Sequence, residues 1–219
     1  MDNQIYKNVT LGRNVTIHAP CIIGMPPRGK VDGELETIIG DDAVIRPFTT
    51  IYAGTKIGSG FQTGQGASIR EDNEIGDGVS IGTHAVLEFG NRIGNDSRIH
   101  TGCFLEDVTI GEHVFVGPNV TFTDDPHPMG CPHYLECAGG ATVGDLAKIG
   151  ANSTILPAVK IGRNALVGAG TVVVRDVREG VVVVGNPARE IGTTDNLPCP
   201  PGFFERAYVW QHYQGIEEP

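Results

Sequence analysis

The stretch IGDDAVIRPFTTIYAGTKIG, residues 39–58, begins a repeat that decides the fold. From Ile39 to Leu105 every sixth residue is aliphatic, except that Thr63 takes one of the twelve positions. A 3.6-residue helix does not produce a six-residue period, and a single strand does not need one. The period therefore indicates a supersecondary repeat, namely a β-solenoid of short strands.

The same spacing continues on both sides of this stretch. It includes Leu11 and Ile17 before it, restarts at Ile110 after one residue is dropped, and returns at Val143. Two segments without the repeat, near residues 24–38 and 123–142, are predicted to be loop insertions. We expect one all-β domain over residues 1–192. A C-terminal tail, residues 193–219, is expected to form an arm or short helix that covers the last coil and buries its aromatic side chains.

The amino-acid composition limits the classes of partner that the protein is expected to bind. A net charge of -10 disfavours binding to nucleic acid and to anionic membranes, because both need basic patches. The five cysteines are an odd number, which fits reduced thiols better than a disulfide framework. The first ten residues, MDNQIYKNVT, lack a signal-peptide pattern. We expect a cytoplasmic protein with small-molecule partners.

Two of the repeats, residues 75–80 (IGDGVS) and 161–166 (IGRNAL), resemble those of the hexapeptide-repeat acyltransferases. The resemblance covers roughly residues 9–191. It implies a left-handed parallel β-helix, a triangular prism with three hexapeptides in each coil, and eight coils in this chain. It also implies a homotrimer, with coenzyme A bound in the groove between neighbouring subunits.

A second resemblance concerns function. Residues 110–128, IGEHVFVGPNVTFTDDPHP, are similar to the IGxNVFxGPNVxFTND stretch of N-acetyltransferases that modify amino sugars, commonly nucleotide-linked ones. This implies transfer of an acyl group from coenzyme A, with acetyl-CoA as co-substrate, to an amine. The segment Pro126-His127-Pro128 departs from the family pattern. An O-acetyltransferase acting on a small hydroxyl acceptor remains an alternative.

The aliphatic residues of the repeat are expected to point into the prism, and the residue after each of them to point outwards. These outward residues include the candidate catalytic groups. The outward residue is glycine on every coil of the first face, whereas the second face carries His100 and the third carries Glu88 and Glu106. We expect His100 to act as the base, a glutamate to orient it, and His84 to lie near them at one corner. One alternative is a structural ladder of acidic residues neutralised by Arg70. Another is a substrate that arrives as the free amine and needs no side-chain base.

Binding residues follow from the family's pattern and from residue chemistry. A glycine amide such as Gly117 is also a candidate donor to the oxyanion. The expected acceptor-binding residues are Asn119, Asp124, Asp125 and His127. The expected cofactor-binding residues are Gly117, Ala151, Lys160, Arg163, Gly168, Ala169 and Arg175.

The second predicted loop contains four candidate metal ligands, His127, Cys131, His133 and Cys137. Imidazole and thiolate are good zinc ligands, but this spacing matches no standard structural zinc motif. We therefore expect a lid or wall of a substrate pocket rather than a metal site, and zinc stays an open alternative. A zinc enzyme of the carbonic-anhydrase type, with His84 and His100 as ligands, and a purely structural module are the other function classes.

Overall fold

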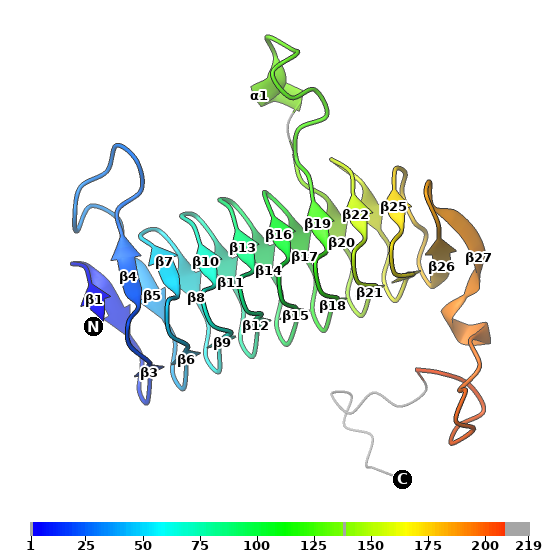
Figure 1. Ribbon diagram of the computed structural model, residues 1–219, viewed down its shortest axis with the longest axis horizontal. Helices are drawn as coiled ribbons and strands as arrows, with labels where there is room; N and C mark the ends of the chain where they lie inside the picture. Colours follow the sequence, from blue (N-terminus) through cyan, green and yellow to red (C-terminus); the bar gives the residue numbers. More distant parts are fainter. Residues whose placement is uncertain (1, 138, 209–219) are drawn as a thin grey trace.

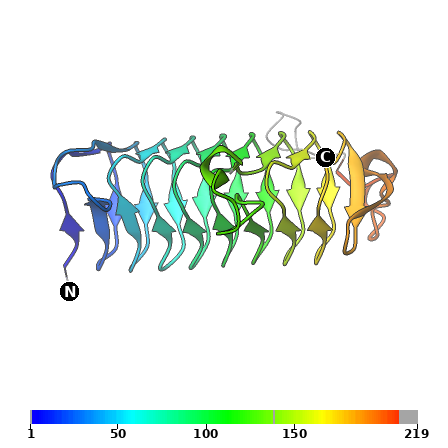
Figure 2. The same ribbon diagram turned by 90° about the horizontal axis from the view of Figure 1, so that it is seen from above.

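The computed structural model describes residues 2–137 and 139–208. Its strands form three parallel sheets that run the length of an elongated, three-sided prism (Figure 1). The view from above shows the coils stacked along one axis (Figure 2). The predicted left-handed parallel β-helix is confirmed.

Each sheet takes one strand from every coil, and strands 17 or 18 residues apart pair in parallel within the regular coils. Sheet A contains, in spatial order, β1 (Gln4–Ile5), β4 (Ile22–Met25), β7 (Thr50–Tyr52), β10 (Ser68–Ile69), β13 (Val86–Leu87), β16 (Phe104–Leu105), β19 (Thr121–Phe122), β22 (Thr154–Ile155) and β25 (Val172–Val173). Sheet B contains β2 (Val9–Leu11), β5 (Thr37–Ile39), β8 (Lys56–Ile57), β11 (Glu74–Ile75), β14 (Arg92–Ile93), β17 (Thr109–Ile110), β20 (Thr142–Val143) and β23 (Lys160–Ile161).

Sheet C ends in the only antiparallel pair among the strands that the structure describes. It contains β3 (Thr16–Ile17), β6 (Val44–Ile45), β9 (Gln62–Thr63), β12 (Ser80–Ile81), β15 (Arg98–Ile99), β18 (Phe115–Val116), β21 (Lys148–Ile149), β24 (Leu166–Val167), β26 (Val181–Val184) and β27 (Arg189–Thr193). Strand β27 pairs antiparallel with β26 and leads into a 3-10 turn, η1 (Thr194–Asn196). These elements form an arm at the C-terminal end of the prism.

The repeated aliphatic residues fill the interior. Ile45, Ile69 and Leu105 are completely buried, and the exception Thr63 is also inside. Its hydroxyl accepts a hydrogen bond from the Arg46 amide at 2.8 Å, so the polar group has a partner. Burying such a hydroxyl without a partner would cost about 1–3 kcal/mol.

Glycine follows the inward residue on sheet B because the next coil lies against it. A Cβ atom at Gly40 would lie only 2.6 Å from backbone atoms of Gly58 and Ser59. Side chains are therefore excluded there, and this face carries little chemistry. Cys21 and Cys103 lie inside the prism, with 2% and 1% of their surface exposed.

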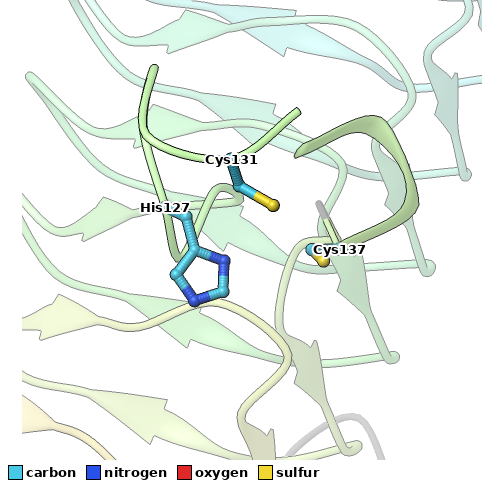
Figure 3. A group of neighbouring side chains, drawn as sticks. All are labelled: His127, Cys131 and Cys137. Carbon is cyan, nitrogen blue, oxygen red and sulfur yellow. The ribbon is translucent and has the colours of Figure 1, made fainter. Parts of the chain in front are cut away.

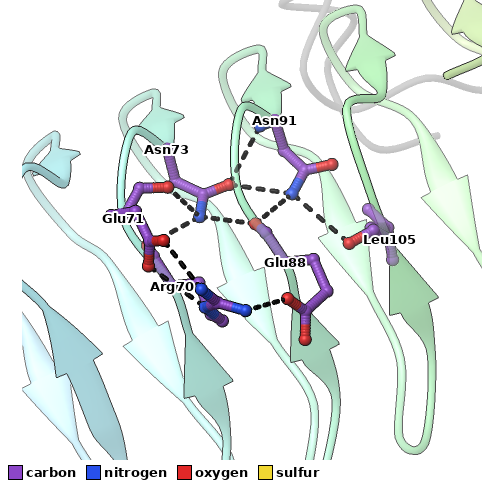
Figure 4. Close-up of polar contacts among 6 residues, drawn as sticks. All are labelled: Arg70, Glu71, Asn73, Glu88, Asn91 and Leu105. Atoms are coloured by element: carbon purple, nitrogen blue, oxygen red, sulfur yellow. Dashed lines mark hydrogen bonds and ion pairs between the residues drawn. The ribbon is translucent and has the colours of Figure 1, made fainter. Parts of the chain in front are cut away.

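A polar ladder replaces aliphatic packing at the corner where sheet A turns into sheet B (Figure 4). The Asn91 side-chain amide donates to Asn73 Oδ1 at 2.8 Å and to the Glu88 carbonyl at 2.8 Å. Its own oxygen accepts from the Val108 amide at 3.0 Å. The buried asparagines thus supply hydrogen bonds to backbone groups of a tight turn that has no room for regular strand-to-strand hydrogen bonding.

Both long insertions leave the prism between sheets A and B (Figure 1). We call residues 26–36 the β4–β5 loop and residues 123–141 the β19–β20 loop, after the strands they connect. The second loop contains one short helix, α1 (Tyr134–Cys137). No helix among the described residues is long and apolar enough to cross a membrane.

The expectation that the tail buries its aromatic residues is wrong for the part that the structure describes. Phe203 is 82% exposed, Phe204 40% and Tyr208 44%. The described segment after η1 lies to one side of the prism near its C-terminal end (Figure 1), and Tyr208 meets Lys148 on sheet C instead of folding over the last coil. Residues 209–219 of the predicted tail, including Trp210, lie outside the described residues.

Candidate functional site

A groove lies on sheet C of the described structure. Its centre is a column of outward side chains on four stacked strands, because β15, β18, β21 and β24 pair in register. The groove has a volume of about 830 Å³, and Tyr208 of the tail forms part of its wall. The column consists of Arg98, Phe115, Lys148 and Leu166.

Lys148 is the half-buried cation of this groove. Its Nζ donates to Asn164 Oδ1 at 2.6 Å and lies 4.5 Å from the centre of the Tyr208 ring. Burial lowers the pKa of Lys148, because the charged amine loses water that these contacts do not fully replace. An anionic ligand in the groove would restore that lost stabilisation.

Two of the predicted cofactor residues, Gly168 and Ala169, line this groove. The structure does not bring the predicted basic residues to it. Arg163 forms an ion pair with Asp145 at 3.3 Å, Lys160 lies on sheet B, and Arg175 borders a separate hollow near the C-terminal arm. The groove is lined instead by Arg98 and Lys148, together with His113 and the carboxylate of Asp96.

The predicted oxyanion role of Gly117 is wrong. Its amide already donates to the Ile149 carbonyl at 2.8 Å as part of the coil-to-coil hydrogen bonding. The residue is also buried, so no substrate atom can reach the N–H. Ala151, another predicted cofactor residue, sits in the turn that follows β21 and is not part of the groove wall.

On sheet A the predicted acidic ladder is present and is largely neutralised (Figure 4). Arg70 donates through Nη1 to Glu88 Oε2 at 2.6 Å and through Nη2 to Glu71 Oε1 at 2.7 Å. Its guanidinium also lies 5.7 Å from the centre of the Tyr52 ring. Glu88 is therefore held by a structural ion pair, as the alternative interpretation expected.

Glu106 has a different environment from Glu88. Burial raises the pKa of Glu106, and the nearby charges of Asp124 and Glu88 raise it further, while Arg70 opposes them. Asp124 belongs to the β19–β20 loop, so the base of that loop meets sheet A here. A carboxyl group with a raised pKa is a better proton acceptor near neutral pH than an ordinary one.

The predicted gathering of His84 and His100 with Glu88 and Glu106 is wrong. In each coil the histidines lie where sheet C turns into sheet A, whereas the glutamates lie at the far end of sheet A. His84 and Glu88 are four positions apart along the chain, a span of up to about 13 Å at 3.3 Å per residue. Among the described residues no hydrogen bond or ion pair joins the two groups.

His100 instead lies beside Phe115, a residue that lines the groove. Its ring packs against Phe115 with centroids 4.9 Å apart and an angle of 55° between the planes. His84 and Asn119 take turn positions with φ of 54° and 57°, in the left-handed region. Asparagine tolerates that region well, so its presence there is explained by the turn alone.

In the β19–β20 loop, three of the four candidate metal ligands come together (Figure 3). These are His127, Cys131 and Cys137. His133 lies apart from the group, and its Nδ1 is 3.0 Å from Glu136 Oε1. Asp125 accepts a hydrogen bond from the His127 amide at 2.7 Å and so shapes the turn.

The residues that sequence reasoning missed are Phe115 and Lys148. Phe115 precedes the inward residue Val116, and Lys148 precedes the inward residue Ile149. The sequence-based prediction of the site rests only on the residues that follow inward positions. Side chains alternate along a strand, so both neighbours of an inward residue point outwards. The signal was therefore available in the sequence as a second column.

Comparison with known proteins supports the repeat and the fold. Residues 140–175 match the family model "Bacterial transferase hexapeptide (six repeats)". The galactoside O-acetyltransferase of Escherichia coli is 39% identical over 89 residues, which are 38% of this chain and 44% of that protein. A 2,3,4,5-tetrahydropyridine-2,6-dicarboxylate N-acetyltransferase of Clostridium perfringens is 57% identical over 47 residues, 22% of this chain and 20% of that protein.

Among solved structures, the UDP-N-acetylglucosamine acyltransferase of Bacteroides fragilis aligns with a TM-score of 0.70 at 21% identity. The alignment covers 88% of this chain and 74% of that chain. At this identity the likeness establishes the shared β-helix fold. The chain spans less than half the length of the two curated relatives it matches.

Proposed function

Because the chain has the six-residue repeat and the β-helix of the hexapeptide-repeat acyltransferases, we propose that it transfers an acetyl group from acetyl-CoA to a sugar. The observation that carries this proposal is the groove on sheet C. It combines apolar walls, Phe115 and Leu166, with the cations Arg98 and Lys148. Such a groove suits a ligand with an apolar arm and phosphate groups.

The proposed acceptor is an amino sugar, nucleotide-linked as in the enzymes that share the 110–128 motif. An ammonium cannot attack a thioester, so its proton must leave first. We assign that step to His100, whose ring packs on Phe115 at the groove. The amine then forms a bond to the acetyl carbon, the carbon–sulfur bond breaks, and the thiolate of coenzyme A leaves and takes up a proton.

A sugar hydroxyl is the second candidate acceptor. The relative that favours it is the galactoside O-acetyltransferase, whose similarity covers 38% of this chain. A hydroxyl is a weaker nucleophile than a free amine and depends more strongly on a general base. Replacement of His100 by alanine should therefore lower O-acetylation by about 100-fold, and N-acetylation by less if the amine arrives already deprotonated.

The test uses coenzyme A and the matched variants Lys148→Ala and Lys160→Ala. Calorimetry should show that Lys148→Ala weakens coenzyme A binding by about 10-fold, because one charge-assisted contact to phosphate is lost. Lys160→Ala, on the exposed surface of sheet B, should leave binding unchanged. Release of free thiol from acetyl-CoA, measured with amino sugars and with galactosides, identifies the acceptor. If millimolar coenzyme A does not bind, the proposed function is wrong.

A further inference from the structure

Three side chains that can bind a metal come together in the β19–β20 loop (Figure 3). The thiol groups of Cys131 and Cys137 and a ring nitrogen of His127 all lie within 4.8 Å of one another. Zinc bonds of about 2.3 Å to sulfur and about 2.1 Å to nitrogen place tetrahedral ligand atoms about 3.5–3.8 Å apart. Small side-chain rotations would therefore close the group around one ion.

The donor atoms select the kind of metal. Two thiolates and one imidazole are soft ligands that favour zinc over magnesium or calcium, which prefer oxygen. Both cysteines are free thiols, and neither is buried. The interior cysteines, Cys21 and Cys103, differ in this respect, because burial raises their pKa and disfavours the thiolate that a metal needs.

The local backbone already supports a thiolate at Cys131. The amide of His133 donates to the Cys131 sulfur at 3.4 Å. Such a donor stabilises negative charge on sulfur and holds the ligand in one orientation. The imidazole of His133 meets Glu136 instead of joining the group, which leaves three protein ligands.

The described side chains of the loop form no buried cluster. No described residue between Thr123 and Gly140 is buried. Inside the loop, the Gly130 amide donates to the His127 carbonyl at 3.0 Å, and the Gly139 amide donates to the Asp124 carbonyl at 2.8 Å. Peptide segments too small to form a hydrophobic core are commonly stabilised by a disulfide or a structural metal.

We propose that His127, Cys131 and Cys137 bind a zinc ion that cross-links the β19–β20 loop, with the fourth coordination position open to solvent. The ion joins the turn at His127 to the end of α1. It thereby orders the loop above its base, where Asp124 lies near Glu106. This site stands independently of the acetyl-transfer function proposed above.

The test is metal analysis of the full chain, purified without a histidine tag and with reductant present. We expect about one zinc per chain. Replacing zinc with cobalt(II) should give the visible absorption of a tetrahedral site and a thiolate-to-cobalt charge-transfer band. Removing zinc with a chelator should speed chymotrypsin cleavage inside the loop while the melting temperature of the prism stays the same, because solenoid coils are stabilised by their neighbours.

Matched variants separate the ligands from other thiols and imidazoles. Cys131→Ser, Cys137→Ser and His127→Ala should each lower zinc affinity by about 10-fold or more. Cys199→Ser and His133→Ala should keep the wild-type affinity, since Cys199 lies in the tail and His133 pairs with Glu136. Zinc well below one equivalent, a disulfide between Cys131 and Cys137 in the reduced preparation, or equal loss of zinc in His133→Ala would overturn the proposed site.

Discussion

The two insertions leave the prism at the same corner but are stabilised in different ways. The β4–β5 loop is tied to the first coil: Asp32 accepts from the Lys7 amide at 2.8 Å, and the Gly33 carbonyl accepts from the Asn8 side chain at 3.3 Å. In the β19–β20 loop, the side-chain hydrogen bonds of Asp125, Cys131 and His133 all go to other residues of the same loop. The first loop is an extension of the prism, and the second stands apart from it (Figure 1).

This difference shows what each loop is suited to do. A loop fastened to its own coil by polar contacts adds a rigid edge to the prism. A projecting loop without a core needs another cross-link, and it can place side chains far from the coils. The second loop also lies in the middle of the prism, where its base meets Glu106. It is therefore the loop that we associate with function.

Removing each loop in turn gives the largest expected contrast. The Gly139 amide bonds to the Asp124 carbonyl at 2.8 Å, so residues 125–138 can be replaced by two glycines without opening the coil. Under the proposed function, this deletion should lower acetyl transfer by about 100-fold, because groups that position the acceptor are lost. The thiol-release assay measures the effect.

The control removes the other loop. Replacing residues 26–35 with two glycines should leave the acetyl-transfer rate nearly unchanged, since that loop follows β4, four coils away from β16 and Glu106 on sheet A. Circular dichroism should show folded β structure in both variants, because each coil is stabilised by its neighbours. Equal losses of activity in the two deletions would show that the contrast between the loops has no functional meaning.

The point where the second loop returns to the prism can be tested with two adjacent glycines. A methyl group at position 140 would overlap the backbone carbonyls of Asp107 and Glu106, whereas one at position 139 would have nothing within 4 Å. Gly140→Ala should therefore destabilise the protein by about 1–3 kcal/mol, and Gly139→Ala by much less. Urea unfolding measures both. A similar loss in both variants would mean that the loop is not packed against the coil at this point.

The coils could be predicted because the same side-chain packing recurs in every coil. Each coil buries the same kind of side chain at the same position, so the predicted coil starts, from Leu11 to Ile161, are the last residues of the eight strands of sheet B. The site could be predicted less well. The six-residue period assigns a side chain to a face of the prism but does not show at which edge of that face it lies. For this reason the sequence groups His84 with Glu88, although they lie at opposite edges of sheet A.

The loop shows a second limit of the sequence. The residue types at His127, Cys131 and Cys137 suggested a metal, but the spacing matched no known pattern. The three ligands meet because of a turn at Asp125 and the short helix α1, neither of which follows a period. In the same way, the charge of Asp124 in the loop helps to raise the pKa of Glu106 on the coil, and this proximity leaves no trace in the repeat.

The smallest expected effect is a pH dependence at the base of the second loop. Burial raises the pKa of Glu106, Asp124, Glu88 and Asp107 raise it further, and Arg70 opposes them, so the fold favours the protonated acid. The resulting stabilisation is fully present below the unfolded pKa of about 4.3 and is lost as pH rises through the folded pKa. Near pH 4, Glu106→Gln should therefore have about the same melting temperature as the wild type. Near pH 7.5, its melting temperature should exceed that of the wild type by about 2 °C or less, as calorimetry can measure.

The control is Glu88→Gln, which loses an ion pair at 2.6 Å and should have a lower melting temperature than the wild type near pH 7.5. A lower melting temperature for Glu106→Gln at that pH would show that the Glu106 carboxylate is stabilised by the fold, and that the loop base does not carry the unfavourable charge we infer.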